Sequence, residues 1–129
     1  MRLEELRKKI NQLDAKIVSL LNERAKLSTF IGKEKIKHNR SIYSPEREKK
    51  VLEQVKAFNH GPMSSDGLEA IYREIMSTSL SLEKPLHIAY LGTEGSFTYM
   101  AAFNQFGSQV EYVSCNTIND VFFNARCQR

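Results

Sequence analysis

The sequence predicts an all-α unit of three helices followed by a short α/β fragment. Apolar residues recur with heptad spacing from Leu3 to Ile31, no proline occurs before Lys37, and Gly32 is the only glycine in this stretch. This pattern predicts one long helix. After residues 84–85 the sequence changes to short apolar runs bounded by glycine, which is typical of buried strands.

The first predicted helix, residues 3–37, carries a narrow apolar stripe. At ~1.5 Å per residue it would be roughly 50 Å long, which is more than a small domain can cover. Its stripe therefore needs a partner, most simply a second copy of the chain. The stripe consists of Leu3, Leu6, Ile10, Leu13, Ile17, Leu20, Leu27 and Ile31. The position seven residues after Ile17 is an arginine, Arg24.

Two shorter helices follow a break at "HNRSIY", residues 38–43. The stretch "SPERE" predicts a helix start, with Ser44 as the N-cap and Pro45 in the first turn, where its missing N–H costs nothing. The stretch "NHGPMSSDG" is rich in helix breakers and predicts a turn. A third helix is expected over roughly Leu68–Glu83.

The C-terminal stretch has the alternation of a βαβ unit. Strands are expected in "LHIAYLG" and "VEYVS", with a helix in "TYMAAFNQFG" that ends at Gly107, and another helix could begin in "TINDVFF". Two strands in about 44 residues are too few to close an α/β core. We therefore expect two parts, a helical domain over residues 1–85 and a truncated α/β fragment over residues 86–129.

Charge is unevenly distributed between these two parts. Residues 1–85 contain 17 Lys/Arg and 12 Asp/Glu, whereas residues 86–129 contain 2 and 3. The basic helical part is compatible with an anionic partner, either a nucleic acid or a small anion. The apolar content of 41% and charged content of 26% indicate a soluble globular protein.

The sequence contains no recognisable signal for membrane insertion, secretion or metal binding. No apolar run approaches the ~20 residues of a membrane span, and the charged start "MRLEELRKKI" does not resemble a secretion signal. We expect a cytoplasmic protein without membrane association. Cys115 and Cys127 form no metal-ligand cluster and are expected to be ordinary thiols.

Arg24 within the apolar stripe is the first candidate for a functional side chain. A polar residue there can simply set the register of a coiled coil, and an arginine can extend its guanidinium to the surface. Lys35, however, lies eleven residues further on, close to three helical turns, so it shares a face with Arg24. The axial separation of roughly 16 Å would allow two long side chains to hold a small anion between them.

Polar residues of the other helices can join this face. Arg47 and Glu48 lie at the start of the second helix, and Ser79 and Glu83 lie one turn apart on the third. Each alone is most often a solvated or packing residue, but together they predict a polar pocket inside a helical bundle. Arg7 lies some 25 Å from Arg24 along the first helix, so only a partner subunit could bring its own copy to the pocket.

The residues that carry these features resemble a known family. "LRKKINQLDAKIVSLLNERAKLSTFIGKEKIK", "YSPEREKKVLEQV" and "REIMSTSLSLEKPL" resemble the all-helical chorismate mutase domain, in particular that of bifunctional chorismate mutase–prephenate dehydratases. This resemblance covers about residues 1–85. "IAYLGTEGSFTYMAAFNQFG" is similar to the start of the dehydratase domain, although that family usually has proline where Thr93 stands.

The resemblance implies an intertwined homodimer with two equivalent sites and chorismate as the substrate. It implies that Arg24 and the partner subunit's Arg7 grip the two carboxylates of the substrate. Lys35 would reach a carboxylate and the ether oxygen, and Glu83 would donate a hydrogen bond to the ether oxygen. Arg24, Lys35 and Glu83 are thus the implied catalytic residues.

The remaining implied contacts come from the second and third helices. Glu48 would accept from the ring hydroxyl, supported by Arg47 and with the Ser44 backbone nearby. Ser79 would touch a carboxylate. Two positions depart from one pattern of the family, because Ser44 stands where an aspartate can occur and Glu83 where a glutamine can occur. The second departure makes activity depend on the protonation of Glu83.

The resemblance implies an isomerase that converts chorismate to prephenate in phenylalanine and tyrosine biosynthesis, without cofactor or metal. Dehydratase activity is not expected, because the catalytic Thr-Arg-Phe region of that family lies beyond this sequence. Two alternatives stay open. A basic helical module that binds nucleic acid is suggested by the pI of about 9.1 and "GKEKIKHNR", and a plain coiled-coil dimerisation module is suggested by the heptad stripe.

Overall fold

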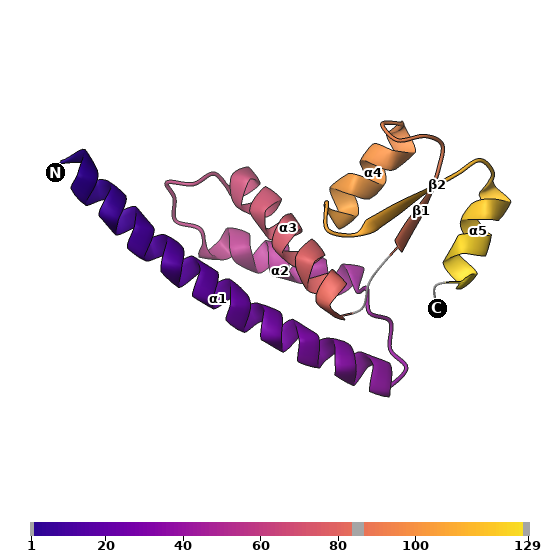
Figure 1. The fold of residues 1–129 in the computed structure, drawn as a ribbon, viewed down its shortest axis with the longest axis horizontal. Helices are drawn as coiled ribbons and strands as arrows, with labels where there is room; N and C mark the ends of the chain where they lie inside the picture. Colours follow the sequence, from indigo (N-terminus) through magenta and orange to yellow (C-terminus); the bar gives the residue numbers. More distant parts are fainter. Residues whose placement is uncertain (1, 84–86, 128–129) are drawn as a thin grey trace.

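The structure is a computed structural model that describes residues 2–83 and 87–127 of the chain. Within these ranges three helices are followed by a strand–helix–strand–helix segment (Figure 1). The elements are α1 (Leu3–Lys37), α2 (Pro45–Phe58), α3 (Ser65–Glu83), β1 (His87–Leu91), α4 (Phe97–Phe106), β2 (Glu111–Cys115) and α5 (Ile118–Cys127). The prediction of a helical part followed by an α/β fragment is confirmed. The expected boundary at residues 85–86 lies outside the described residues.

The long helix α1 has the predicted bounds, but most of its apolar stripe is uncovered. Figure 1 shows its N-terminal part projecting beyond α2 and α3. Large apolar side chains along this part are 42–62% exposed. They are Leu3, Leu6, Ile10, Leu13, Ile17 and Leu20. Only Ser28 and Gly32, in its C-terminal half, are buried.

Gly32 marks a close approach of the α1 and α3 backbones. A Cβ atom at this position would lie 2.6 Å from the Cα of Glu83 and 2.7 Å from the Glu83 carbonyl oxygen. Only a residue without a side chain allows the two backbones to come this close. Glu83 is therefore held against the last third of α1, one turn before Lys35.

The starts of α2 and α3 depend on serine caps. The Ser44 hydroxyl accepts a hydrogen bond from the Arg47 N–H (3.3 Å), and Pro45 occupies the first helical position, both as predicted. Helix α3 begins at Ser65, earlier than the expected Leu68, because the Ser64 hydroxyl accepts from the Gly67 N–H at 3.0 Å. This cap brings residues of the predicted turn into the helix.

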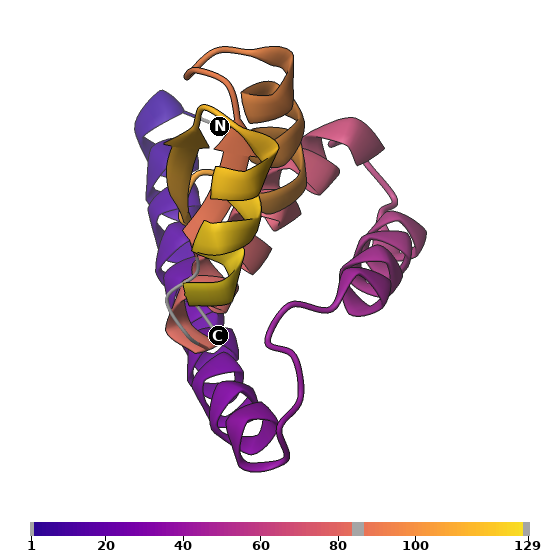
Figure 2. The same cartoon turned by 90° about the vertical axis from the view of Figure 1, so that its right-hand side faces the viewer.

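Helix α3 is the central element of the helical part. It packs against both α1 and α2, whereas α1 and α2 have no close backbone contact with each other within the described residues. Figure 2 shows α2 well separated from α1. Val55, Met76, Ser77 and Leu80 are the buried side chains of α2 and α3. Helix α3 therefore closes one side of the space between α1 and α2.

The C-terminal segment contains a parallel pair of strands between two helices. β1 and β2 pair in register from His87 with Glu111 to Leu91 with Cys115, and Figure 1 shows them between α4 and α5. Ser96 caps α4 by accepting from the Tyr99 N–H at 3.2 Å. The predicted βαβ unit is confirmed, and the helix that could begin in "TINDVFF" is α5.

The core of this segment is small. Tyr90, Val110 and Cys115 are buried, and aromatic rings of α4 contact those of the strands. Phe97 on α4, in contrast, is 93% exposed and Phe122 on α5 is 62% exposed. None of the helices in the described residues is long and apolar enough to cross a membrane.

Candidate functional site

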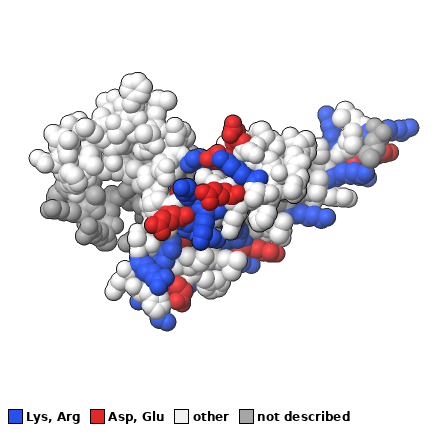
Figure 3. Space-filling view, turned by 180° about the vertical axis from the view of Figure 1, so that it is seen from behind, with Lys and Arg blue, Asp and Glu red and all other residues white. Residues whose placement is uncertain are grey.

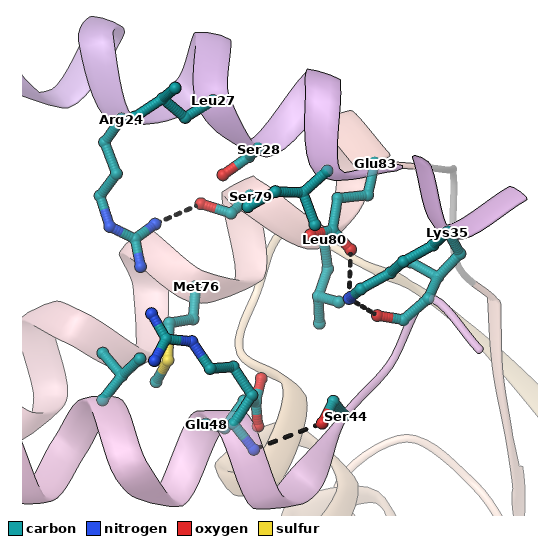
Figure 4. Close-up of a pocket in the computed structure, with 14 residues that line it drawn as sticks. Arg24, Leu27, Ser28, Lys35, Ser44, Glu48, Met76, Ser79, Leu80 and Glu83 are labelled. Carbon is teal, nitrogen blue, oxygen red and sulfur yellow. Dashed lines mark hydrogen bonds and ion pairs between the residues drawn. The ribbon is translucent and has the colours of Figure 1, made fainter. Parts of the chain in front are cut away.

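A cavity of about 440 Å³ lies between α1, α2 and α3. Seven of the eight predicted site residues line it, as Figure 4 illustrates for most of them. The seven are Arg24 and Lys35 on α1, Ser44, Arg47 and Glu48 at the start of α2, and Ser79 and Glu83 on α3. Side chains up to 59 residues apart in the sequence therefore surround one space.

Arg24 extends from the stripe of α1 towards α3. Its Nη1 donates to the Ser79 hydroxyl at 2.7 Å, and that hydroxyl donates in turn to the Ile75 carbonyl at 2.9 Å. None of the ion pairs formed by the described residues involves Arg24. A half-buried guanidinium with a neutral partner retains its capacity to bind an anion.

Lys35 is fixed between the third helix and the loop before α2. Its Nζ donates to the Ile42 carbonyl at 2.7 Å and to the Glu83 carboxylate at 3.3 Å (Figure 4). The side chains of Lys35 and Glu83 are only 22% and 10% exposed. This ammonium therefore has a defined position at one end of the cavity.

Burial raises the pKa of the Glu83 carboxyl, and the Lys35 and Arg24 cations only partly offset this effect. The group is therefore easier to protonate than an ordinary glutamate. A protonated carboxyl can donate a hydrogen bond, whereas the ionised form only accepts. Glu83 can thus act as a donor or as a counter-ion, depending on pH.

The α2 side of the cavity carries a second carboxyl and a third cation. Burial raises the pKa of Glu48, while the Arg73 cation and a hydrogen bond from the Tyr43 hydroxyl lower it. The Arg47 side chain is exposed and lines the cavity close to Glu48. With Glu83 protonated, three cations face one anion across the lining, so the cavity is suited to a ligand that carries two negative charges.

Arg7 lies on the exposed N-terminal part of α1 and does not line this cavity. Seventeen residues of one helix separate it from Arg24, which corresponds to roughly 25 Å. The predicted separation of Arg7 from Arg24 within one chain is therefore confirmed. The contribution of Arg7 to a site in the partner subunit stays a prediction.

Sequence reasoning did not identify the apolar wall of the cavity. The wall consists of Leu27, Ile31, Ile42, Val51, Met76 and Leu80, with the small Ser28 among them. A signal was present, because positions 27, 28 and 31 lie between Arg24 and Lys35 on the same face of α1. An apolar wall with few polar groups gives a small ligand shape selection and a defined orientation.

The surface charge around the site is mixed. Figure 3 shows Lys and Arg side chains interspersed with Asp and Glu over the helical part, and almost no charge on the visible face of the α/β part. A nucleic-acid interface would be expected to show a continuous basic stripe, and this face does not show one.

The structure is that of a helical protein with a cation-lined cavity between three helices, a lining that is suited to a small anion. The chorismate mutase type II family model matches residues 6–84, and the prephenate dehydratase model matches residues 88–129. The chain belongs to the chorismate mutase type II family.

Similar proteins agree with these matches. The bifunctional chorismate mutase/prephenate dehydratase of Aquifex aeolicus is 45% identical over 131 residues, covering 98% of this chain and 36% of that protein. The Neisseria gonorrhoeae protein of the same name is 42% identical, over 90% of this chain and 32% of its own length. The chain thus spans about a third of the length of these relatives.

A solved structure extends the comparison to the fold. Chorismate mutase (Form II) from Thermus thermophilus is 32% identical, with a TM-score of 0.64, and the match covers 65% of this chain and 96% of that one. The predicted three-helix chorismate mutase fold is confirmed by this similarity. The intertwined dimer stays a prediction.

Proposed function

We propose that residues 3–83 form a chorismate mutase, an isomerase that converts chorismate to prephenate. The observation that carries the proposal is the single cavity that contains Arg24, Lys35, Glu48 and Glu83 in a chain of this family. The reaction is an intramolecular rearrangement in which the ether C–O bond breaks as a new C–C bond forms. It requires neither a covalent intermediate nor a cofactor.

Binding in the proposed site fixes the shape of the substrate. Chorismate is a flexible dianion that reacts only in a folded conformer with its reacting carbons close together. Arg24 and the partner subunit's Arg7 would each hold one carboxylate. Ser79, which is already bonded to Arg24 at 2.7 Å, would contact the same carboxylate as Arg24. The Leu27 and Ile31 side of the cavity would pack against the ring.

The transition state is stabilised where charge develops. Negative charge grows on the ether oxygen as the C–O bond breaks, and Lys35 and a protonated Glu83 would both donate to that oxygen. Their present pairing at 3.3 Å holds the two groups together before the substrate arrives. A bound dianion would raise the pKa of Glu83 further, so substrate binding favours the protonated donor.

The ring hydroxyl of the substrate would be held by the α2 side of the cavity. The Glu48 carboxylate accepts from it, Arg47 supports Glu48, and the Ser44 backbone lies close by. Removing this contact weakens binding in the ground state and in the transition state alike, so it should raise KM more than it lowers kcat.

The proposed active form is a homodimer. The apolar N-terminal part of α1 is uncovered in the single chain, and the same part carries Arg7. Pairing of two such helices would bury the stripe and bring Arg7 of the partner subunit to each cavity. The substrate site would then be complete only in the dimer.

The test is the loss of chorismate absorbance with purified protein, accompanied by formation of prephenate. We expect Lys35→Ala to lower kcat/KM by roughly 10²–10³-fold, because one donor to the developing oxyanion is lost. Lys33→Ala is the matched control, since Lys33 is an exposed lysine of α1 outside the cavity lining. An inactive wild type, or equal effects of the two variants, would refute the proposal.

Shared sites can be tested by mixing Arg7→Ala with Arg24→Ala chains after unfolding and refolding them together. Each mixed dimer should contain one site with both arginines and one with neither. Random pairing makes half of the dimers mixed, so about a quarter of wild-type activity should return. A mixture no more active than its parents would contradict a site built from two subunits.

A further inference from the structure

The end of α4 contacts a tyrosine in the loop between α1 and α2, next to residues that line the mutase cavity. Gln105 Nε2 donates to the Tyr43 hydroxyl at 2.7 Å, although the two residues are 62 positions apart. Tyr43 lies in the loop before α2, and its ring packs against Phe106 with centroids 4.8 Å apart. The α/β segment and the helical part therefore share a contact beside the start of α2.

The same hydroxyl is a neighbour of the Glu48 carboxylate, and the interaction between the two groups raises the pKa of Tyr43 and lowers that of Glu48. A phenol has one hydrogen to donate and lone pairs to accept with. Because Gln105 Nε2 is a donor, the hydroxyl accepts from Gln105 at 2.7 Å and keeps its own hydrogen for the neighbouring Glu48 carboxylate. The arrangement therefore leads from α4, through the Tyr43 hydroxyl, to a carboxylate of the substrate cavity.

Glu48 lies between the substrate cavity and a second groove. It lines both of them, and Gln105 and Arg73 line only the groove. The carboxylate can therefore be held from the groove side by protein groups while it faces the substrate cavity on the other side.

Gln105 is itself fixed by contacts of the neighbouring residues with α3. The Asn104 carbonyl accepts from Arg73 Nη1 at 3.1 Å, and the Ser108 N–H donates to the Glu74 carboxylate at 3.1 Å. The Ser77 hydroxyl accepts from the Gln109 N–H at 3.0 Å. The corner between α4 and β2 thus docks on α3 at points on both sides of Gln105.

We propose that Gln105 and Tyr43 are positioning residues for Glu48, and that the α/β segment thereby contributes to substrate binding in the mutase cavity. The inference rests on the proposed function. A glutamate side chain has three rotatable bonds, and fixing one carboxylate oxygen from behind restricts where the other points. The conformational entropy that the Glu48 side chain has already lost in the free protein does not have to be lost again when the substrate hydroxyl binds.

The charge state of Glu48 gives a second measurable consequence. Charged side chains from all three helices of the bundle line the cavity or the groove that Glu48 also lines, and Gln105 on α4 adds a neutral donor. They are Arg24 and Lys35 on α1, Arg47, Lys49, Glu53 and Lys56 on α2, and Glu69, Arg73 and Glu83 on α3. Against this background the Tyr43 bond lowers the pKa of Glu48. Loss of the bond should raise that pKa, so acceptor function is lost at a higher pH.

The experiment compares Tyr43→Phe, Gln105→Leu and Gln105→Glu in the full chain, with Gln54→Leu as a control on the exposed side of α2. We expect Tyr43→Phe to raise KM for chorismate about three- to ten-fold with a smaller change in kcat. The acidic limb of kcat/KM should move to higher pH. The double variant Tyr43→Phe/Gln105→Leu should lose no more than Tyr43→Phe alone.

The two glutamine variants separate positioning from packing. Gln105→Glu keeps the shape of the side chain but removes the amide donor and adds a negative charge close to Glu48, so it should bind chorismate more weakly than Gln105→Leu. If Gln105 only fills space, the order should be reversed. That reversed order, or an unchanged KM and pH profile in an active Tyr43→Phe enzyme, would overturn the inference.

A further measurement does not depend on turnover. The bond from Gln105 lowers the pKa of Tyr43, so Gln105→Leu should shift the ionisation of Tyr43 to higher pH in an ultraviolet titration, with Tyr43→Phe identifying its contribution. An unshifted titration overturns the contact whether or not the protein is active. If the wild type has no mutase activity but Gln105→Leu still shifts the ionisation of Tyr43, the proposed function and the catalytic role of this contact are refuted. The contact between Gln105 and Tyr43 is then still supported.

Discussion

Glu83 places a titratable group where the proposed reaction requires a hydrogen-bond donor. Burial raises the folded-state pKa of this carboxyl, so the protonated donor is present below that pKa and is lost as pH rises through it. We therefore expect kcat/KM to decline with increasing pH. Glu83→Gln should flatten this decline near neutral pH, because an amide donates at every pH. The pH dependence of kcat/KM in both proteins is the measurement.

Glu46→Gln serves as the control for this prediction, since Glu46 is an exposed glutamate of α2 outside the cavity lining. It should keep the wild-type pH profile. If Glu83→Gln also keeps the wild-type decline, Glu83 does not donate to the ether oxygen, and another titrating group must be responsible.

For individual residues, the sequence was sufficient to predict the position of some side chains around the cavity and insufficient for others. Helical spacing alone places Arg24 and Lys35 on one face, and both line the cavity. The contact of Gln105 with Tyr43 could not be predicted in this way. It depends on how α4 docks on α3, and no periodicity within one element encodes the packing of two distant elements.

Gly32 controls the spacing of two helices. An alanine in the interior of a helix is intrinsically favoured over glycine by about 1 kcal/mol. Here, however, the new Cβ would overlap the Glu83 backbone at 2.6 Å, which a side-chain movement cannot relieve. We expect Gly32→Ala to destabilise the protein by roughly 1–2 kcal/mol net and to lower kcat/KM by separating Lys35 from Glu83. Urea unfolding and the chorismate assay measure the two effects.

Gly67→Ala is the matched control for this substitution. Gly67 lies in the first turn of α3, and the nearest atom to its new Cβ would be the Ser64 hydroxyl at 3.0 Å, the end of a short side chain. Its stability should change little or rise by up to about 1 kcal/mol. If Gly32→Ala behaves like Gly67→Ala, the close approach of α1 and α3 has no energetic importance.

Element boundaries followed from the sequence where the capping chemistry was recognised. Ser44 and Pro45 gave the start of α2 correctly. The start of α3 was placed too late, because Ser64 within "PMSSDG" was interpreted as part of a turn although it acts as a helix cap. Serines, aspartate and glycine favour both structures, so only the observed hydrogen bond decides between them.

For the whole molecule, the apolar stripe of α1 is the feature that one chain cannot satisfy. Full burial of a single isoleucine or leucine stabilises by roughly 1.5–3 kcal/mol, and six such side chains between Leu3 and Leu20 are at least 42% exposed. The heptad spacing predicted that this stripe would need a partner. Spacing alone does not fix the direction in which the partner helix runs, and only an antiparallel one would bring its Arg7 to the cavity.

The dimer can be tested with one charge placed in the stripe and one placed beside it. Ile17 is 51% exposed on the stripe, and Lys16 is an exposed neighbour that points elsewhere on the helix. We expect the wild type to sediment with twice the chain mass of 14.8 kDa. Ile17→Glu should weaken the dimer, because association would bury an unpaired carboxylate from each chain. Its specific activity should therefore fall on dilution, whereas that of Lys16→Glu should not. A wild type that sediments as a single chain and is still fully active would show that one subunit completes the site without Arg7 of another.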